Sequence, residues 1–318
     1  MSRDGLRLSV TLLSILPESI VPASRPAEPR PAPGPPDPAW AGRATAPPTA
    51  DGRDDFARPP WPDAEPPVHG APAGGSAPGP APSRQTAAEA MLWAPVVGLV
   101  LGVIAASVLY VFGHLLHTGS LVAAVLAVGS LAVLTRGLHL DGLADLADGL
   151  GSRRPADGAL AVMRRSDIGP FGVVTLVLVL LIQVAGLTQA DSSGRGVPAV
   201  IVAAVTGRLA ITSACRRGVP PARPDGLGAL VAGGVAPAAA LLLTALVLAA
   251  TVAGILAAAA VAAVPVEWIL PVAVAAGLVA GAVLAEYASR RLGGVTGDVL
   301  GAVAETATAA CLLVTAIS

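Results

Sequence analysis

From residue 91 onward, long apolar stretches alternate with short polar segments. A helix needs about 20 apolar residues to cross the hydrocarbon of a bilayer, and inside lipid it satisfies its own backbone hydrogen bonds. The pattern therefore predicts an all-α, polytopic membrane bundle of about seven transmembrane helices. The expected spans are 94–116, 119–135, 171–189, 197–215, 235–264, 268–288 and 299–317, the fifth long enough to tilt, kink or extend beyond the bilayer.

The first 86 residues have a different pattern. Apolar residues between Gly5 and Leu16 predict a helix too short to span a bilayer, so residues 1–21 are expected to lie on the membrane surface. The alternative for this stretch is the apolar core of a signal peptide. Residues 22–86 are rich in Pro and Ala and show no apolar periodicity, which predicts a disordered insertion. The membrane-embedded domain is then expected at 87–318.

The arginines predict the orientation. Loops on one side of the expected bundle carry ten of them, whereas Arg195 alone lies in the opposite loops. The positive-inside rule places the arginine-rich loops in the cytoplasm, and with them the N-terminus, which disfavours a cleaved signal peptide. We therefore expect a multi-pass protein of a bacterial cell membrane. The ten are Arg136, Arg153, Arg154, Arg164, Arg165, Arg216, Arg217, Arg223, Arg290 and Arg291.

Composition narrows the class further. The 318 residues are 54% hydrophobic and only 13% charged, which is typical of a membrane protein and excludes an ordinary soluble enzyme. The formal net charge of −1 leaves no basic surface for a nucleic acid.

The segment 136–149 carries the strongest candidate chemistry. If it is helical, Asp141, Asp145 and Asp148 share one face, at i, i+4 and i+7. Three carboxylates at that spacing repel one another unless a cation neutralises them, and oxygen ligands suit Mg²⁺. We predict that these three aspartates hold Mg²⁺ and carry the catalysis; the alternative for one of them is to accept a proton. The alternative is a solvated acidic helix face.

Three other loops combine Arg with Gly and Asp, at 163–172, 222–228 and 290–298. Arginine binds phosphate oxygens in a bidentate manner, and glycine lets the backbone approach closely, so these loops are expected to bind an anion. Within the expected spans, Arg208 and Glu305 lie at matching depth, as a site or a structural ion pair. The predicted substrate-binding residues are Arg136, His139, Arg164, Ser166, Arg208, Arg223, Asp225, Thr296 and Asp298.

Four motifs resemble the cobalamin synthase family, the membrane-embedded adenosylcobinamide-GDP ribazoletransferases. They are Gly137 to Asp145 with Asp148, Ile168 to Gly172, Ala222 to Gly228, and Gly293 to Gly301. The likeness covers residues 88–318 and extends to Leu6–Pro17. The chain departs from the family at the insertion and at Arg164-Arg165-Ser166-Asp167, where members commonly order the charges as Lys or Arg, Asp, Ser, Arg.

The resemblance implies a late step of cobalamin assembly. A ribose hydroxyl of α-ribazole, or of its 5′-phosphate, attacks the cobinamide-linked phosphorus of adenosylcobinamide-GDP and expels GMP, with Mg²⁺ required. Other enzymes of nucleotide-loop assembly are possible partners. Two rival interpretations remain: a CDP-alcohol-type lipid phosphotransferase, and a transporter whose path is lined by buried ionisable residues.

Overall fold

The computed structural model describes residues 83–262 and 268–317. The helix predicted at 1–21 and nearly all of the insertion predicted at 22–86 lie outside these residues. The part of the chain that is described is helical, with two isolated bridges between loops and no named strand. Its helices are α2 (Arg84–Tyr110, continued by a π-helical turn, Val111–Leu115), α3 (Ser120–Leu134), α4 (Leu138–Gly151), α5 (Ala156–Val162), α6 (Pro170–Ser192), α7 (Gly196–Ala214), α8 (Gly226–Val231), α9 (Pro237–Ala262), α10 (Ile269–Leu292) and α11 (Gly297–Thr315).

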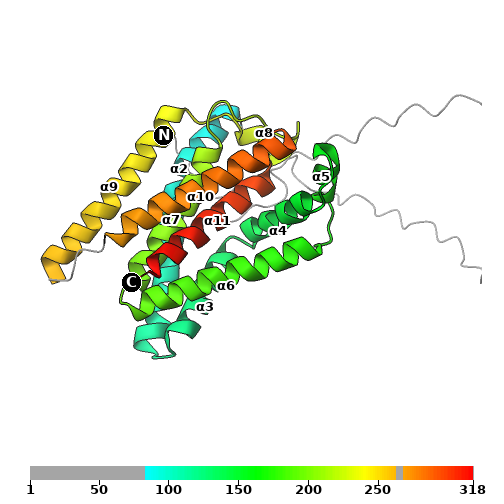
Figure 1. The fold of residues 1–318 in the computed structure, drawn as a ribbon. Coiled ribbons are helices and arrows are strands. Elements are labelled where there is room, and N and C mark those ends of the chain that lie inside the picture. Colours follow the sequence, from blue (N-terminus) through cyan, green and yellow to red (C-terminus); the bar gives the residue numbers. More distant parts are fainter. Residues whose placement is uncertain (1–82, 263–267, 318) are drawn as a thin grey trace, which may run out of the picture. The chain divides into compact units, whose positions relative to one another are not determined.

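The helices confirm the predicted fold class. Six of them are long and apolar enough to cross a membrane, and α3 with α4 forms a bent pair that makes a seventh if it counts as one span. The long helices run side by side in Figure 1, and α9 lies at the edge of the bundle. The bundle is centred on α7 and α11, since 67% and 61% of their apolar windows are buried, against 11% for α9.

The predicted second span is the one that differs. The chain turns at Arg136 and Gly137, which adopt left-handed backbone angles with φ of 53° and 70°, so α3 and α4 meet at 88°. Alone, the 15 residues of α3 reach about 22 Å, less than the hydrocarbon thickness. The prediction that 119–135 spans the membrane alone is therefore wrong. The aspartate-bearing segment is not an external loop either: α4 packs against α6 and α11 (Figure 1).

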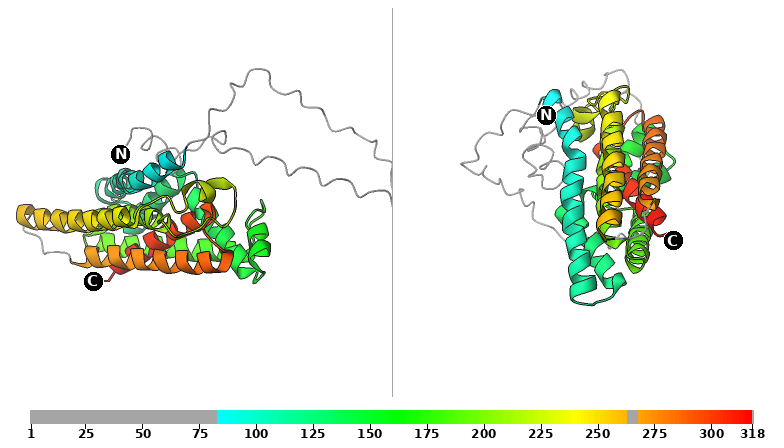
Figure 2. Two further views of the ribbon diagram at one scale, coloured as in Figure 1. Left: turned by 90° about the horizontal axis from the view of Figure 1, so that it is seen from above. Right: turned by 90° about the vertical axis from the view of Figure 1, so that its left-hand side faces the viewer.

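The start of α2 lies three residues before the predicted domain boundary at 87. Ser83 is its N-cap, because the Ser83 hydroxyl accepts a hydrogen bond from the Thr86 N–H at 3.1 Å. The first turn of α2 therefore includes the last residues of the predicted insertion. Two further views in Figure 2 show α2 running along one flank of the bundle.

Short polar segments join the helices at one end of the bundle, which we call the arginine-rich end. Val295 exchanges backbone hydrogen bonds with Pro220 and Ala222, which ties the α10–α11 connection to the α7–α8 connection. Arg291, in the last turn of α10, donates a hydrogen bond to the carbonyl of Arg154 and so ties the α4–α5 connection to the same group of loops. Three loops that are far apart in sequence are therefore fixed side by side. The arginines of this end lie in the α4–α5, α5–α6 and α7–α8 connections and in the last turn of α10; they are Arg153, Arg154, Arg164, Arg165, Arg216, Arg217, Arg223, Arg290 and Arg291.

Candidate functional site

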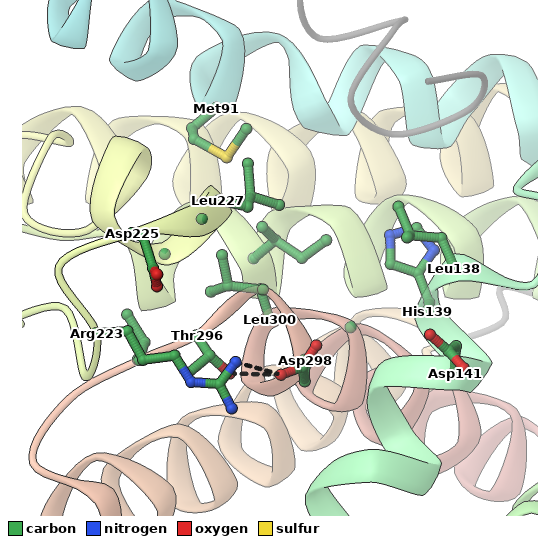
Figure 3. A pocket seen from close by; sticks show the side chains of 16 residues that line it. Met91, Leu138, His139, Asp141, Arg223, Asp225, Leu227, Thr296, Asp298 and Leu300 are labelled. Carbon is green, nitrogen blue, oxygen red and sulfur yellow. Dashed lines mark hydrogen bonds and ion pairs between the residues drawn. The ribbon is translucent and has the colours of Figure 1, made fainter. Parts of the chain in front are cut away.

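A cavity of about 260 Å³ lies at the arginine-rich end (Figure 3). It is enclosed by α2, α4, α7, α8 and the first turn of α11, so its walls come from five separate helices. The cavity is lined by both polar and large apolar side chains. The polar side chains are His139, Asp141, Arg223, Asp225, Thr296 and Asp298, and the large apolar ones are Met91, Leu138, Ile211, Leu227, Val295 and Leu300.

The start of α11 forms one wall of the cavity. The Thr296 hydroxyl accepts the Val299 N–H at 3.2 Å and so caps the helix. It also lies 3.2 Å from Asp298 Oδ2. Because Thr296 already serves as the cap, the Asp298 carboxylate remains in the first turn and faces Arg223, whose Nη1 is 3.8 Å from Oδ2 (Figure 3).

Arg223 is fixed from two sides. Its Nη2 donates to the carbonyl of Leu160 in α5 at 2.8 Å, while Nη1 approaches Asp298. Burial lowers the pKa of the Arg223 guanidinium, Asp298 opposes that shift, and the positive charge of Arg164 adds to it. A phosphate in the cavity would supply further negative charge next to Arg223 and favour its charged form.

A second ion pair lies at the outer edge of the cavity. Arg164 Nη2 is 3.1 Å and 3.4 Å from the two carboxylate oxygens of Asp225. This contact joins the loop after α5 to the start of α8. Two of the three loops predicted to bind an anion, 163–172 and 222–228, therefore meet here, and the cavity lining adds the third, 290–298.

Close packing of α4 against α11 brings three carboxylates together. A Cβ at Gly142 would lie 2.8 Å from both the Cα and the carbonyl oxygen of Asp298, so only glycine fits there. Asp145 consequently lies within electrostatic range of both Asp141 and Asp298. We call Asp141, Asp145 and Asp298 the acidic cluster.

Asp148 makes different contacts. Its two carboxylate oxygens accept the N–H groups of Gly169 and Gly172 at 2.6 Å and 2.9 Å. A Cβ at either glycine would come within 2.5 Å of these oxygens, which explains why both positions are glycine. The carboxylate thus caps the start of α6 and is only 8% exposed.

Comparison with known proteins shows which family the chain resembles. Residues 76–316 match the family model described as cobalamin-5-phosphate synthase. The chain belongs to this family. Proteins named adenosylcobinamide-GDP ribazoletransferase are similar to it: that of Frankia casuarinae is 45% identical over 74% of this chain and 87% of its own, and that of a Nocardioides species 38% over 72% and 87%. That of Bradyrhizobium diazoefficiens is 35% identical over 74% and 86%. No solved structure matches the chain.

Family membership agrees with the resemblance found in the four motifs, and it favours the transferase over the lipid phosphotransferase and the transporter. In three of the four motifs, close packing explains why glycine is present. Glycine permits the α4–α11 contact at Gly142, the capping by Asp148 at Gly169 and Gly172, and at Gly228 the approach of α8 to Val295, whose oxygen would lie 2.6 Å from a Cβ.

The structure separates the other predicted site residues. Besides the polar lining named above, Arg164 touches Asp225 at the edge of the cavity. Ser166 is exposed on the α5–α6 connection and does not line the cavity. Arg136 is exposed at the bend between α3 and α4. Arg208 lies behind the cavity, next to His139.

Sequence reasoning missed the apolar side of the cavity. Met91, Ile211, Leu227 and Leu300 lie in apolar helical segments and carry no signal that separates them from core residues. It also grouped Asp298 with a loop rather than with the aspartates of α4. Two glycines that face α4 or α11 across this crossing, Gly142 and Gly301, were the available hint.

Oxygen donors of the acidic cluster are of the type that Mg²⁺ prefers. In the described residues, no three Asp, Glu, His or Cys side chains are arranged so that together they could hold a metal ion. Mg²⁺ usually takes only one or two protein carboxylates and completes its shell with water and substrate phosphate. The mutual repulsion within the cluster and its open cavity therefore fit a cation that is shared with a phosphate-bearing substrate.

Proposed function

We propose that the chain transfers the phosphocobinamide group of adenosylcobinamide-GDP to a free ribose hydroxyl of α-ribazole or of its 5′-phosphate. The products are adenosylcobalamin or its 5′-phosphate, and GMP. The observation that carries the proposal is the cavity in which Asp141, Asp298 and Arg223 meet from three segments of a chain of this family. The similar proteins named adenosylcobinamide-GDP ribazoletransferase support the choice of substrates.

The side chains of the cavity have separate tasks in this reaction. Arg223 contacts phosphate oxygens of the pyrophosphate, and Arg164 provides positive charge at the edge. The hydroxyl oxygen forms the new P–O bond as the bond to GMP breaks, and a carboxylate of the acidic cluster accepts the hydroxyl proton. The apolar wall formed by Met91, Leu227 and Leu300 excludes water from one side of the reacting group.

One or two carboxylates of the acidic cluster, among Asp141, Asp145 and Asp298, would hold Mg²⁺. The ion would neutralise charge on the pyrophosphate and on the leaving GMP. Asp148 has its carboxylate occupied by two backbone N–H groups, which favours a positioning role for it over the predicted metal-binding one.

We further propose that the arginine-rich end faces the cytoplasm of a bacterial cell. Nine of the ten arginines that predict the orientation lie at this end, in its connections or in the last turn of α10, and Arg195 lies at the start of α7, near the opposite end of the bundle. The positive-inside rule then places the cavity on the side where nucleotide substrates are made.

The test is the complete reaction in a bilayer. The protein, reconstituted in vesicles, is given adenosylcobinamide-GDP and α-ribazole with Mg²⁺ or with a chelator, and GMP and the cobamide are separated and quantified. We expect equal amounts of both products, and neither with the chelator. The absence of GMP release from correctly inserted protein contradicts the proposal.

Two variants and a matched control assign the reaction to the cavity. Asp141→Asn and Asp145→Asn remove charge from the acidic cluster, whereas Asp157→Asn removes one from an exposed position in α5, at the same end but outside the cavity. We expect the first two to lose turnover and the third to retain it. Equal turnover in all three variants contradicts a role for the cluster.

A further inference from the structure

Four buried polar side chains lie together behind the cavity. They come from four different helices, and each is at most 9% exposed: His139 of α4, Gln183 of α6, Arg208 of α7 and Glu305 of α11. Charges inside a membrane bundle are costly unless they are paired, and such residues are usually functional. The proposed reaction does not yet use this group.

The four side chains form a connected series. Gln183 Nε2 donates to Glu305 Oε2 at 2.7 Å, and Arg208 Nη2 lies 3.3 Å from His139 Nδ1. Glu305 and Arg208 lie within electrostatic range of each other, and their opposite charges attract. The series therefore ends at one ring nitrogen of His139.

The identity of the donor settles the state of the ring. A guanidinium has only donor N–H groups, so Nδ1 of His139 must be the acceptor and carry no proton. A neutral imidazole then has its proton on Nε2. Arg208 thus fixes both the tautomer and the orientation of the ring.

His139 is the member that reaches the cavity. It lines the cavity with Asp141 and Asp298 (Figure 3), whereas Arg208, Gln183 and Glu305 line a smaller cavity behind it. Among the described residues, no hydrogen bond is formed by Nε2, and the atom is not among the buried polar atoms that lack a partner. The Nε2–H group is therefore available to a molecule in the cavity.

We propose that Arg208 is a positioning residue that makes His139 a neutral hydrogen-bond donor to a substrate oxygen in the cavity. This inference rests on the proposed function for the phosphate-bearing substrate. The partner has to be an acceptor, and the phosphate oxygens of a nucleotide pyrophosphate have that chemistry. Gln183 orients Glu305 by a hydrogen bond, and the negative charge of Glu305 attracts the Arg208 guanidinium.

The tautomer provides a test that needs no turnover. The chain has four histidines, so ¹⁵N-histidine NMR of the full-length protein in bilayers gives few signals, and the His139→Gln variant identifies that of His139. We expect a bare Nδ1 and a protonated Nε2, and we expect Arg208→Met to abolish this fixed state. A proton on Nδ1, or an unchanged signal in Arg208→Met, overturns the proposal.

Turnover variants test the donor. Gln places an amide N–H near the position of Nε2, whereas the shorter Asn does not reach it, so His139→Gln should retain most of kcat/KM and His139→Asn should lose about 10- to 100-fold, as expected for a hydrogen bond to a charged group. Arg208→Met should lose a similar factor alone and little more in the His139→Asn background. Equal losses in His139→Gln and His139→Asn overturn the proposal.

A control variant separates positioning from folding. Thr206→Val changes a fully buried residue of α7 whose hydroxyl donates to the Val202 carbonyl at 2.7 Å and, among the described residues, forms no hydrogen bond with His139, Gln183, Arg208 or Glu305. It should leave the His139 signal unchanged even if it lowers stability. Should Arg208→Met fail to insert, Arg208→Lys, which keeps the charge but not the guanidinium geometry, takes its place with the same expected change in the signal. If the wild type shows the Nε2 proton but no GMP release, the proposed function fails and the tautomer assignment stands.

Discussion

The starts of α6 and α11 both meet an aspartate, but the two carboxylates serve different purposes. At α6, Asp148 of the neighbouring helix α4 accepts the N–H groups of Gly169 and Gly172. At α11, Thr296 caps the helix, and Asp298 is left facing Arg223 and the cavity. The Asp148 carboxylate accepts two backbone N–H groups within the protein, whereas the Asp298 carboxylate lines the cavity, where a ligand can reach it.

The same difference divides the three aspartates of α4. Asp141 lines the cavity and Asp145 lies within electrostatic range of three other carboxylates, those of Asp141, Asp298 and Asp148, whereas Asp148, one turn further along, caps α6. Residue type and spacing are alike for all three, so the surroundings decide the role. Carboxylates that repel one another are stabilised by a bound cation, whereas a carboxylate that caps a helix stabilises the fold.

The largest expected effect concerns Asp145. Asp145→Asn should lower kcat about 10²- to 10⁴-fold, as expected when a catalytic carboxylate is removed. Because it also relieves repulsion with Asp141 and Asp298, the thermal midpoint in detergent should stay constant or rise. Turnover and thermal unfolding measured on one preparation check both. A fall in the midpoint together with normal turnover would contradict the comparison.

Asp148 should behave in the opposite manner. Asp148→Ala removes a buried acceptor of two backbone N–H groups, so the free energy of unfolding should fall by about 2–4 kcal/mol. Activity per folded molecule should change much less than in Asp145→Asn. Denaturant unfolding followed by helical circular dichroism is the measurement, with Asp157→Ala as the exposed control. Lost turnover at unchanged stability would return Asp148 to the metal-binding role that the sequence predicts.

Gly142 tests the contact that creates the acidic cluster. Gly142→Ala places a Cβ against the backbone of Asp298, which should cost about 1–3 kcal/mol and move α4 away from α11. Turnover should fall with it, because Asp141 and Asp298 separate. Gly129→Ala is the matched helical control, since nothing lies within 4 Å of its Cβ. Similar turnover and stability in both variants would show that this contact does not position the site.

The sequence predicted the fold well because the bilayer imposes a length on each apolar segment. The observed α9 at Pro237–Ala262 and α10 at Ile269–Leu292 lie within a few residues of the predicted spans 235–264 and 268–288. The bend between α3 and α4 could not be predicted in the same way. It depends on left-handed backbone angles at Arg136 and Gly137, and hydropathy carries no information on them.

The candidate site was predicted in its residue types but not in its grouping. Asp141, Arg223 and Asp298 were singled out as charged residues beside glycines, and the structure brings them to one cavity. Their grouping follows from helix crossings, which a single sequence does not specify. Spacing alone predicts Asp148 as a metal ligand; it does not reveal that Asp148 caps α6, because the start of α6 lies over 20 residues away in sequence.

The smallest expected effect is at the edge of the cavity. The ion pair of Arg164 and Asp225 is 54% and 40% exposed, so solvent screens it, and a double-mutant cycle of Arg164→Gln and Asp225→Asn should give a coupling of about 0.2–1 kcal/mol in stability. If Arg164 also attracts the nucleotide substrate, Arg164→Gln should raise KM several-fold with kcat unchanged, and added salt should weaken that difference. A change in kcat instead would move Arg164 from the edge of the site to the reacting phosphate. Arg164 would then act as Arg223 is proposed to act, as a charged side chain that contacts the substrate.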